Sequence, residues 1–220
     1  MIFAVLPMKS PGTGKTRLDG HFSEGERAAL ASAMFADVLI ALTRATKLEG
    51  VLVVSADAEV ARIAGLHGAN WIDEGSASSH SEAALVGIAH CASLGARRVL
   101  LVPGDCPAIT ANEIDMLASS DFGERSVAVM ADRHGSGTNG LLISPPDLIT
   151  PAFGPGSCQR HLDLAESAGA EAVVLEPKGF QMDVDTPEDL ESLALYLEEI
   201  RGEAANTRGL LLQRELLRNG

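Results

Sequence analysis

The chain has 220 residues, 46% of them hydrophobic and 21% charged, and its 17 basic and 30 acidic side chains give a net charge of −13. Such a composition is typical of one globular domain with a sizeable core. The acidic balance argues against nucleic acid or an anionic membrane surface as a partner, because both bind to basic faces. No apolar run approaches the ~20 residues of a membrane-spanning helix.

Short apolar segments alternate with longer segments of helical periodicity. In chain order we predict a strand over 2–6, a helix over 23–47, a strand over 51–55, a helix over 58–67, a short strand over 70–73, a helix over 81–94, strands over 98–102, 126–131 and 140–144, a helix over 158–168, a strand over 172–175 and a helix over 186–200. Alternating strands and helices form a mostly parallel sheet with helices on both faces. The predicted fold is therefore a doubly wound α/β domain over residues 1–200.

The last part of the chain, residues 201–220, has a different pattern. Its leucines stand among charged residues after a polar stretch, at Leu210, Leu211, Leu212, Leu216 and Leu217. An apolar stripe of this size usually packs against another surface. We expect a helical tail that is docked on the domain, docked on a partner subunit in a homodimer, or mobile.

The three cysteines indicate the redox environment. Cys91, Cys106 and Cys158 are odd in number, far apart and without a CxxC pair. This pattern argues against a disulfide framework and against a zinc site. We therefore expect a cytoplasmic protein.

A cationic, glycine-containing loop follows the first predicted strand, and ligands of open α/β sheets bind at the carboxyl ends of the strands. Its basic side chains are Lys9, Lys15 and Arg17, around the sequence GTGKT. A P-loop would need glycine five positions before Gly14, where this chain has Lys9. The loop favours phosphate binding of another type, and a P-loop NTPase with a degenerate motif is the alternative.

Acidic residues follow the strand over 98–102 and precede the last predicted helix. Asp105 stands in a Gly-Asp-Cys-Pro turn, and Asp183 and Asp185 lie on one face of an extended segment. Neighbouring carboxylates repel each other unless a cation lies between them. The three aspartates therefore predict an oxygen-rich magnesium site, although a lone turn aspartate could also cap a helix.

Two glycine-rich turns come next in importance, over residues 134–140 and 153–157. The second opens a predicted helix, whose free amide groups favour an anion. Thr138 and Ser157 add hydroxyl groups to these turns. Each turn taken alone is compatible with an ordinary loop, but together with the aspartates they suggest a second anionic substrate that faces the nucleotide.

These motifs together resemble the guanylyltransferases of coenzyme F(420) biosynthesis. The resemblance extends over about residues 1–200 and rests on the KTRL loop, the GDxP turn, the FGPGS turn and the DVDTPEDL segment. The family belongs to the nucleotidyltransferases with a GT-A-like fold, as do the molybdenum-cofactor guanylyltransferases. The resemblance implies that GTP and a phosphorylated three-carbon acid react to give a guanylylated acid and pyrophosphate.

The resemblance also implies roles for individual residues. The triphosphate would be neutralised by Lys9, Lys15 and Arg17, and the magnesium ion would be held by Asp105, Asp183 and Asp185. Lys15, Arg17 and Asp105 would be the catalytic residues. The phosphate or carboxylate of the acid would be bound by Thr138, Gly154 and Ser157. Such a reaction needs positioning and charge neutralisation and no enzyme nucleophile.

One position departs from the family pattern. Where the family commonly has asparagine before a short apolar pair, this chain has Glu82. Its carboxylate could accept hydrogen bonds from the N1–H and N2–H₂ groups of guanine. Equally, Glu82 could be a solvated residue in the first turn of a helix.

The predicted function is guanylyl transfer from GTP to a small phosphorylated acid with Mg²⁺. Phosphoenolpyruvate is the first expectation for the acid, and 2-phospho-L-lactate and 3-phospho-D-glycerate are the others. The alternatives are another nucleotidyltransferase such as the molybdenum-cofactor type, the P-loop NTPase, and a catalytically silent nucleotide-binding protein. Their products separate them, because only a nucleotidyltransferase releases pyrophosphate.

Overall fold

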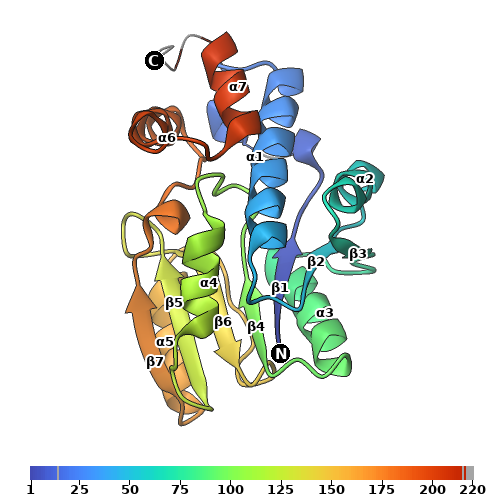
Figure 1. The fold of residues 1–220 in the computed structure, drawn as a ribbon, viewed down its shortest axis with the longest axis vertical. Coiled ribbons are helices and arrows are strands. Elements are labelled where there is room, and N and C mark those ends of the chain that lie inside the picture. Colours follow the sequence, from blue (N-terminus) through green and yellow to red (C-terminus); the bar gives the residue numbers. More distant parts are fainter. Residues whose placement is uncertain (14, 215, 217–220) are drawn as a thin grey trace.

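The computed structural model of the chain describes residues 1–13, 15–214 and 216. Within these residues seven strands form one sheet in the order β3-β2-β1-β4-β6-β5-β7, with helices packed against it (Figure 1). The strands are β1 (Ile2–Pro7), β2 (Gly50–Val54), β3 (Asn70–Ile72), β4 (Arg98–Leu101), β5 (Ser126–Ala131), β6 (Thr138–Ser144) and β7 (Glu171–Leu175). All neighbouring pairs are parallel except those of β6, which runs antiparallel to β4 and β5.

The helices cover both faces of the sheet. They are α1 (Glu24–Arg44), α2 (Ala58–Leu66), α3 (His80–Ser93), α4 (Ala111–Ser119), α5 (Ser157–Ser167), α6 (Pro187–Glu199) and α7 (Ala205–Gln213). Short 3₁₀ turns lie at Pro11–Thr13, Thr16–Leu18 and Lys178–Gln181. None of the helices in the described residues has the length and apolar content needed to cross a membrane.

The five inner strands of the sheet contribute to two cores, because successive side chains point to opposite faces, whereas the edge strands β3 and β7 are partly exposed. In β1, Leu6 packs in a core with Phe35 of α1 and Ile114 of α4. Val5 packs in the other core with Ile88 of α3. Burial on both faces explains the nearly continuous apolar runs of the strands. The predicted doubly wound α/β fold is confirmed.

Helix α4 is the element that the sequence pattern did not predict. It has nine residues, and its apolar stripe consists mainly of Ile114 and Leu117. Its start is fixed by a capping box, in which the Thr110 hydroxyl and the Glu113 carboxylate bond each other's backbone amides. The box is present in the sequence, so the start of this helix could have been predicted.

The reversal of β6 determines where its first residues lie. Leu141 of β6 pairs with Leu101, the last residue of β4. Because the two strands are antiparallel, Thr138 and Asn139 extend beyond the carboxyl end of β4. Polar side chains from a loop predicted to bind an anion therefore reach the edge of the sheet at which parallel strands end.

The C-terminal tail is docked on its own domain over Ala205–Gln213. Helix α7 lies beside α1 (Figure 1), and Leu211 is buried with residues of α1 and α6. The carboxylate of Asp37 in α1 accepts hydrogen bonds from the backbone amides of Asn206 (3.1 Å) and Thr207 (2.8 Å). Asp37 thus caps α7 from another helix, since the N-cap residue Ala204 provides no side-chain bond. Leu217 lies outside the described residues, and a homodimer stays a prediction.

All three cysteines are free and buried. Cys106 is fully buried next to Asp105, and burial raises the pKa of its thiol well above the usual value. Its thiol is therefore protonated and chemically inert near neutral pH. The cytoplasmic location stays a prediction from the cysteine pattern.

We predict that Asp37→Ala destabilises the protein by about 1–3 kcal/mol, because the buried amides of the first turn of α7 lose their acceptor. Urea unfolding followed by circular dichroism measures the change. Asp147→Ala is the matched control, since Asp147 is exposed and its side chain makes no hydrogen bond with the described part of the chain. Equal stability of the two variants would contradict the docking role of Asp37.

Candidate active site

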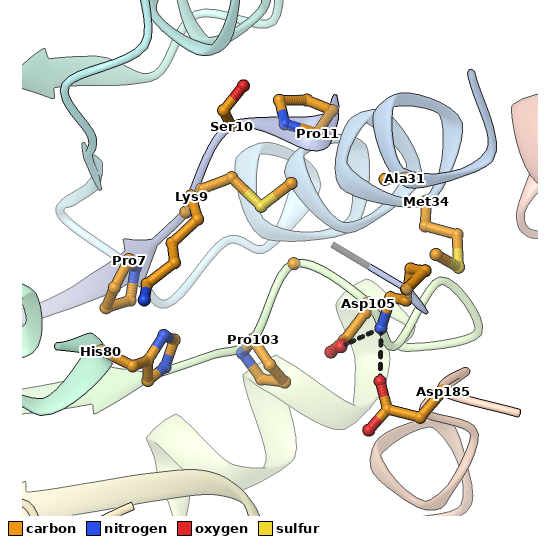
Figure 2. A pocket seen from close by; sticks show the side chains of 13 residues that line it. Pro7, Lys9, Ser10, Pro11, Ala31, Met34, His80, Pro103, Asp105 and Asp185 are labelled. Carbon is orange, nitrogen blue, oxygen red and sulfur yellow. Dashed lines mark hydrogen bonds and ion pairs between the residues drawn. The ribbon is translucent and has the colours of Figure 1, made fainter. Parts of the chain in front are cut away.

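A cavity of about 250 Å³ opens at the carboxyl edge of the sheet, where the loops after β1 and β4 meet the segment before α6. It brings together four of the residues predicted from the sequence, namely Lys9, Lys15, Asp105 and Asp185. Figure 2 shows Asp105 and Asp185 on one side of this cavity and Lys9 with His80 on another. The charged groups therefore line one space although they are up to 176 residues apart, from Lys9 to Asp185.

The ammonium group of Lys15 lies between two carboxylates. Its Nζ atom is 2.5 Å from Oδ2 of Asp105 and 2.9 Å from Oδ1 of Asp185, and Figure 2 marks both contacts. The Lys15 side chain is only 9% exposed. Burial opposes its charged form, but the two carboxylates outweigh this effect and raise the pKa of Lys15. Lys15 is therefore positively charged at neutral pH and lines the cavity.

The backbone of Lys15 is in the left-handed region, with φ of 61°. A residue with a Cβ atom seldom adopts this conformation, which costs roughly 1 kcal/mol. Such conformations persist where surrounding contacts hold them, and they concentrate at functional sites. The two ion pairs provide those contacts here.

The loop that carries Asp105 approaches its neighbours closely. A Cβ atom on Gly104 would lie 2.7 Å from the sulfur of Met8, so a larger residue at this position would require the Met8 side chain to move. The backbone amide of Val184 donates a 3.3 Å hydrogen bond to the carbonyl oxygen of Asp105. This bond joins the aspartate segment before α6 directly to the turn after β4.

The segment before α6 is held by a second carboxylate. Oδ2 of Asp189 accepts hydrogen bonds from the backbone amides of Asp185 (2.9 Å) and Thr186 (2.7 Å). Arg133, from the loop between β5 and β6, forms an ion pair with the other oxygen of Asp189. Asp189 is therefore committed to the backbone, and Asp185 is left with its carboxylate facing the cavity.

Asp183 is oriented by Asn139, whose Nδ2 donates to Oδ1 of Asp183 at 2.9 Å and also to the Phe180 carbonyl oxygen at 2.7 Å. Burial and the neighbouring carboxylate of Asp105 raise the pKa of Asp183 to about 6. The raised value means that this position lacks sufficient compensating positive charge. A further cation close to Asp183 would relieve that deficit.

The donor set suits a divalent cation of the magnesium type, which prefers carboxylate oxygens. Two carboxylates, those of Asp105 and Asp185, already converge on one positive charge. In the described part of the chain, however, no three His, Cys, Asp or Glu side chains are arranged to hold a metal ion. Asp183 is turned to Asn139, so the three aspartates could hold one ion only after Lys15 and Asp183 change partners.

A second group of residues lies next to this cavity. Thr138 lines a small space of about 20 Å³ together with Asn139, Phe153 and His80. The Thr138 hydroxyl is 3.0 Å from Nδ1 of His161, and Nε2 of His161 accepts a 2.9 Å hydrogen bond from the amide of Ala152. Since Nε2 is an acceptor, the neutral ring carries its proton on Nδ1 and donates to Thr138. The oxygen of Thr138 is fixed in this way.

The FGPGS turn leads into α5 beside this group. Gly154 has a φ of 112° and Gly156 one of 71°, values that favour glycine at both positions. Ser157 is the first residue of α5 and is buried. Its amide bonds the Gly154 carbonyl at 3.0 Å, which closes the turn.

Comparisons with known proteins agree with this arrangement. The family model described as guanylyl transferase, CofC like, matches residues 2–211. The chain belongs to this family. It is 42% identical to a phosphoenolpyruvate guanylyltransferase from Conexibacter woesei, over 96% of this chain and 95% of the relative. It is 33% identical to a 3-phospho-D-glycerate guanylyltransferase from Phenylobacterium zucineum, over 88% of this chain and 90% of the relative.

Solved structures support the fold of this guanylyltransferase family member. A protein from Desulfovibrio desulfuricans described as a nucleotide-diphospho-sugar transferase superposes with a TM-score of 0.78, at 18% identity and with 99% of each chain covered. The GT-A-like fold expected from the motifs is thereby confirmed. The family match and the 42% identical relative show that the protein is a nucleotidyltransferase. The P-loop alternative is not supported, because helix α1 begins only at Glu24 and does not follow directly on Lys15.

Five of the predicted residues line neither cavity, namely Arg17, Glu82, Asp183, Gly154 and Ser157. Arg17 is exposed in the 3₁₀ turn Thr16–Leu18 and lines neither space. Glu82 is exposed in the first turn of α3, and its carboxylate accepts hydrogen bonds from the amide (2.6 Å) and hydroxyl (2.8 Å) of Ser78. These bonds lower the pKa of Glu82. A guanine contact by Glu82 stays a prediction.

Sequence reasoning missed three residues of this enzyme's site, namely His80, Asn139 and His161. None of the three belongs to a recognisable motif, and the two histidines show no metal-binding pattern such as HxH or HExxH. Asn139 could have been found, because it stands beside Thr138 in a turn that was already singled out. His80 and His161 can be assigned to the site only once α3 packs on β1 and β2 and α5 packs on β5 and β7.

We predict that His161 makes the stability of the enzyme depend on pH. Burial, with Arg160 nearby, lowers the pKa of His161 to about 4 from 6.5. The unfolded chain therefore binds a proton between these values that the folded protein excludes, and the free energy of unfolding falls as the pH decreases from 6.5 to 4. His161→Gln should flatten this dependence, as measured by urea unfolding.

His21→Gln is the control for the His161 prediction, since His21 is exposed. It should leave the pH profile of the unfolding free energy unchanged. Parallel profiles for the wild type and His161→Gln would contradict the prediction. At pH 7 we expect His161→Gln to be about 1–3 kcal/mol less stable, because buried polar partners are left unpaired.

Proposed function

We propose that this guanylyltransferase joins GMP from GTP to phosphoenolpyruvate, with release of pyrophosphate, as a step of coenzyme F(420) biosynthesis. The observation that carries the proposal is the meeting of Lys15, Asp105 and Asp185 in one cavity, next to a smaller space that Thr138 lines. The 42% identical relative from Conexibacter woesei supports phosphoenolpyruvate as the acid.

The lysines of the loop after β1 suit the triphosphate of GTP. Lys9 and Lys15 both line the cavity, and the loop continues to Arg17. In a protein with a net charge of −13, these side chains supply local positive charge for a polyanion. Lys15 would exchange its contacts with Asp105 and Asp185 for phosphate oxygens when the nucleotide binds.

Asp105, Asp183 and Asp185 are the residues that would hold Mg²⁺ once Lys15 has moved. When bound, the ion neutralises charge on the triphosphate and polarises a phosphoryl oxygen. The amide of Val184 donates a hydrogen bond to the Asp105 carbonyl oxygen, and this bond keeps the segment of Asp183 and Asp185 next to Asp105. The raised pKa of Asp183 supports a role as ligand, since ionised Asp183 requires a nearby cation.

The acid would bind on the side of Thr138, Gly154 and Ser157, where backbone amides and hydroxyls are suited to an anion. An oxygen of the acid's phosphate attacks the α-phosphorus of GTP. The bond from the α-phosphorus to the oxygen that bridges to the β-phosphate breaks, and pyrophosphate leaves. Holding the two anions in line supplies most of the acceleration, so the chain needs no covalent nucleophile.

The decisive measurement is pyrophosphate release with GTP and Mg²⁺, with phosphoenolpyruvate, 3-phospho-D-glycerate and 2-phospho-L-lactate tested separately. We expect release that depends on phosphoenolpyruvate. Release that depends on 3-phospho-D-glycerate would correct the acid and keep the reaction, as relatives from Phenylobacterium zucineum and Colwellia psychrerythraea carry that name. Orthophosphate from the nucleotide alone, with no pyrophosphate, would overturn the proposal.

We further predict that Asp183→Asn lowers kcat/KM by at least about 100-fold, because a metal-binding charge is lost at the triphosphate. The variant should remain folded and, in metal-free buffer at pH 7, at least as stable as the wild type. The sign follows from the pKa of about 6, which exceeds the unfolded value of 3.8, so ionised Asp183 opposes folding.

Steady-state kinetics and urea unfolding test both parts of the Asp183 prediction. Asp147→Asn is the matched control, because Asp147 is an exposed aspartate that lines neither cavity. It should change neither quantity. A folded Asp183→Asn protein with nearly full turnover would exclude Asp183 from the metal site.

A further inference from the structure

His80 stands where the two spaces of the active site meet. The cavity of about 250 Å³ contains the charged loop residues, and the smaller space of about 20 Å³ contains Thr138 and Phe153. Of the described residues, His80 and Pro103 line both spaces, and only His80 has a polar side chain. The imidazole is therefore the one polar group that belongs to both sides of the boundary in this part of the chain.

The ring of His80 is held by packing rather than by hydrogen bonds. The Phe153 ring meets it edge to face, with centroids 5.0 Å apart and planes at 82°. Phe153 packs in the same manner on His161, at 5.3 Å and 72°, and His161 fixes Thr138. The position of His80 is thus tied through two aromatic contacts to the residue expected to bind the acid.

The nitrogen atoms of this ring have no hydrogen-bond partner among the described residues. The His80 side chain makes no hydrogen bond with any described residue, although it is partly buried and an imidazole has two nitrogen atoms that require partners. A partly enclosed polar group without a protein partner commonly bonds a ligand or water. The unused hydrogen-bonding capacity of His80 therefore faces the cavity.

The charges around His80 suit an anionic ligand. Lys9 extends toward the ring in Figure 2, and Asp105 acts on it from the opposite side of the cavity. Burial lowers the pKa of His80, which keeps the ring neutral with one N–H group to donate. A neutral donor can contact a phosphate without adding a further charge to the ion-pair network of Lys15.

We propose that His80 is a substrate-contacting residue whose ring N–H donates a hydrogen bond to the phosphate group of the acceptor acid and holds it at the boundary between the two spaces. The inference rests on the proposed guanylyl transfer. In that reaction an oxygen of the acid's phosphate must meet the α-phosphorus of GTP, so this phosphate has to lie between the acid side and the nucleotide side. His80 occupies that position.

The test compares His80→Phe, which keeps the aromatic contact with Phe153 and removes the donor, with His80→Asn, which keeps an N–H group. For His80→Phe we expect the KM of the acid to rise at least about tenfold and the KM of GTP to stay within about twofold. His80→Asn should recover most of the loss. His90→Phe is the matched control, because His90 lies on the same helix and lines neither space.

A binding measurement separates contact from turnover. Calorimetry with phosphoenolpyruvate, Mg²⁺ and a GTP analogue that has a methylene group between the α- and β-phosphates should show weaker acid binding to His80→Phe and wild-type binding to His90→Phe. Circular dichroism confirms that each variant is folded, and His80→Asn serves as the test variant if His80→Phe is not.

The outcomes distinguish this proposal from the proposed function. If the wild type releases no pyrophosphate with any of the three acids, the proposed function fails. If the wild type is active and His80→Phe leaves the KM and the affinity of the acid unchanged, or raises only the KM of GTP, the role assigned to His80 is wrong while guanylyl transfer stands.

Discussion

The ion pairs of Lys15 are the interaction on which the rest of the site depends. Its ammonium group joins the turn after β4 to the segment before α6, through Asp105 and Asp185. Without a cation at this point, three carboxylates would face each other at one edge of a protein with a net charge of −13. Burial and the neighbouring carboxylate of Asp105 raise the pKa of Asp183 to about 6. The carboxylates at this edge of the sheet therefore require a cation among them, and Lys15 supplies it.

The two sides of the site differ in how they hold charge. On the side of the loop after β1, ionised groups dominate, and backbone bonds such as that from Val184 to Asp105 fix their spacing. On the side of β6, neutral groups dominate, because burial keeps His161 uncharged and lets it hold the hydroxyl of Thr138. The antiparallel direction of β6 brings Thr138 to the same edge of the sheet as the charged residues, and His80 lines the cavities on both sides.

Much of the fold followed from periodicity, and part of it did not. The seven strands were predicted in their places. Burial on both faces gives the inner strands long apolar runs that are easily recognised, whereas the edge strands β3 and β7 are short and partly exposed. Helix α4 was missed although its capping box is present in the sequence, and its length is not the reason, since α2 also has nine residues and was predicted. The docking of α7 was undecided from sequence, because the buried acceptor that caps it is Asp37, on a helix far away in the chain.

The sequence by itself determined the sheet, the family and the charged residues Lys9, Lys15, Asp105, Asp183 and Asp185, because each stands in a motif directly after a strand or before a helix. Only the tertiary structure decided which of them meet. Lys15 joins Asp105 and Asp185, Asp183 is turned to Asn139, and Arg17 and Glu82 lie outside both cavities. The reason is physical: a motif fixes the local direction of the chain, whereas contacts between distant side chains depend on how helices and strands pack.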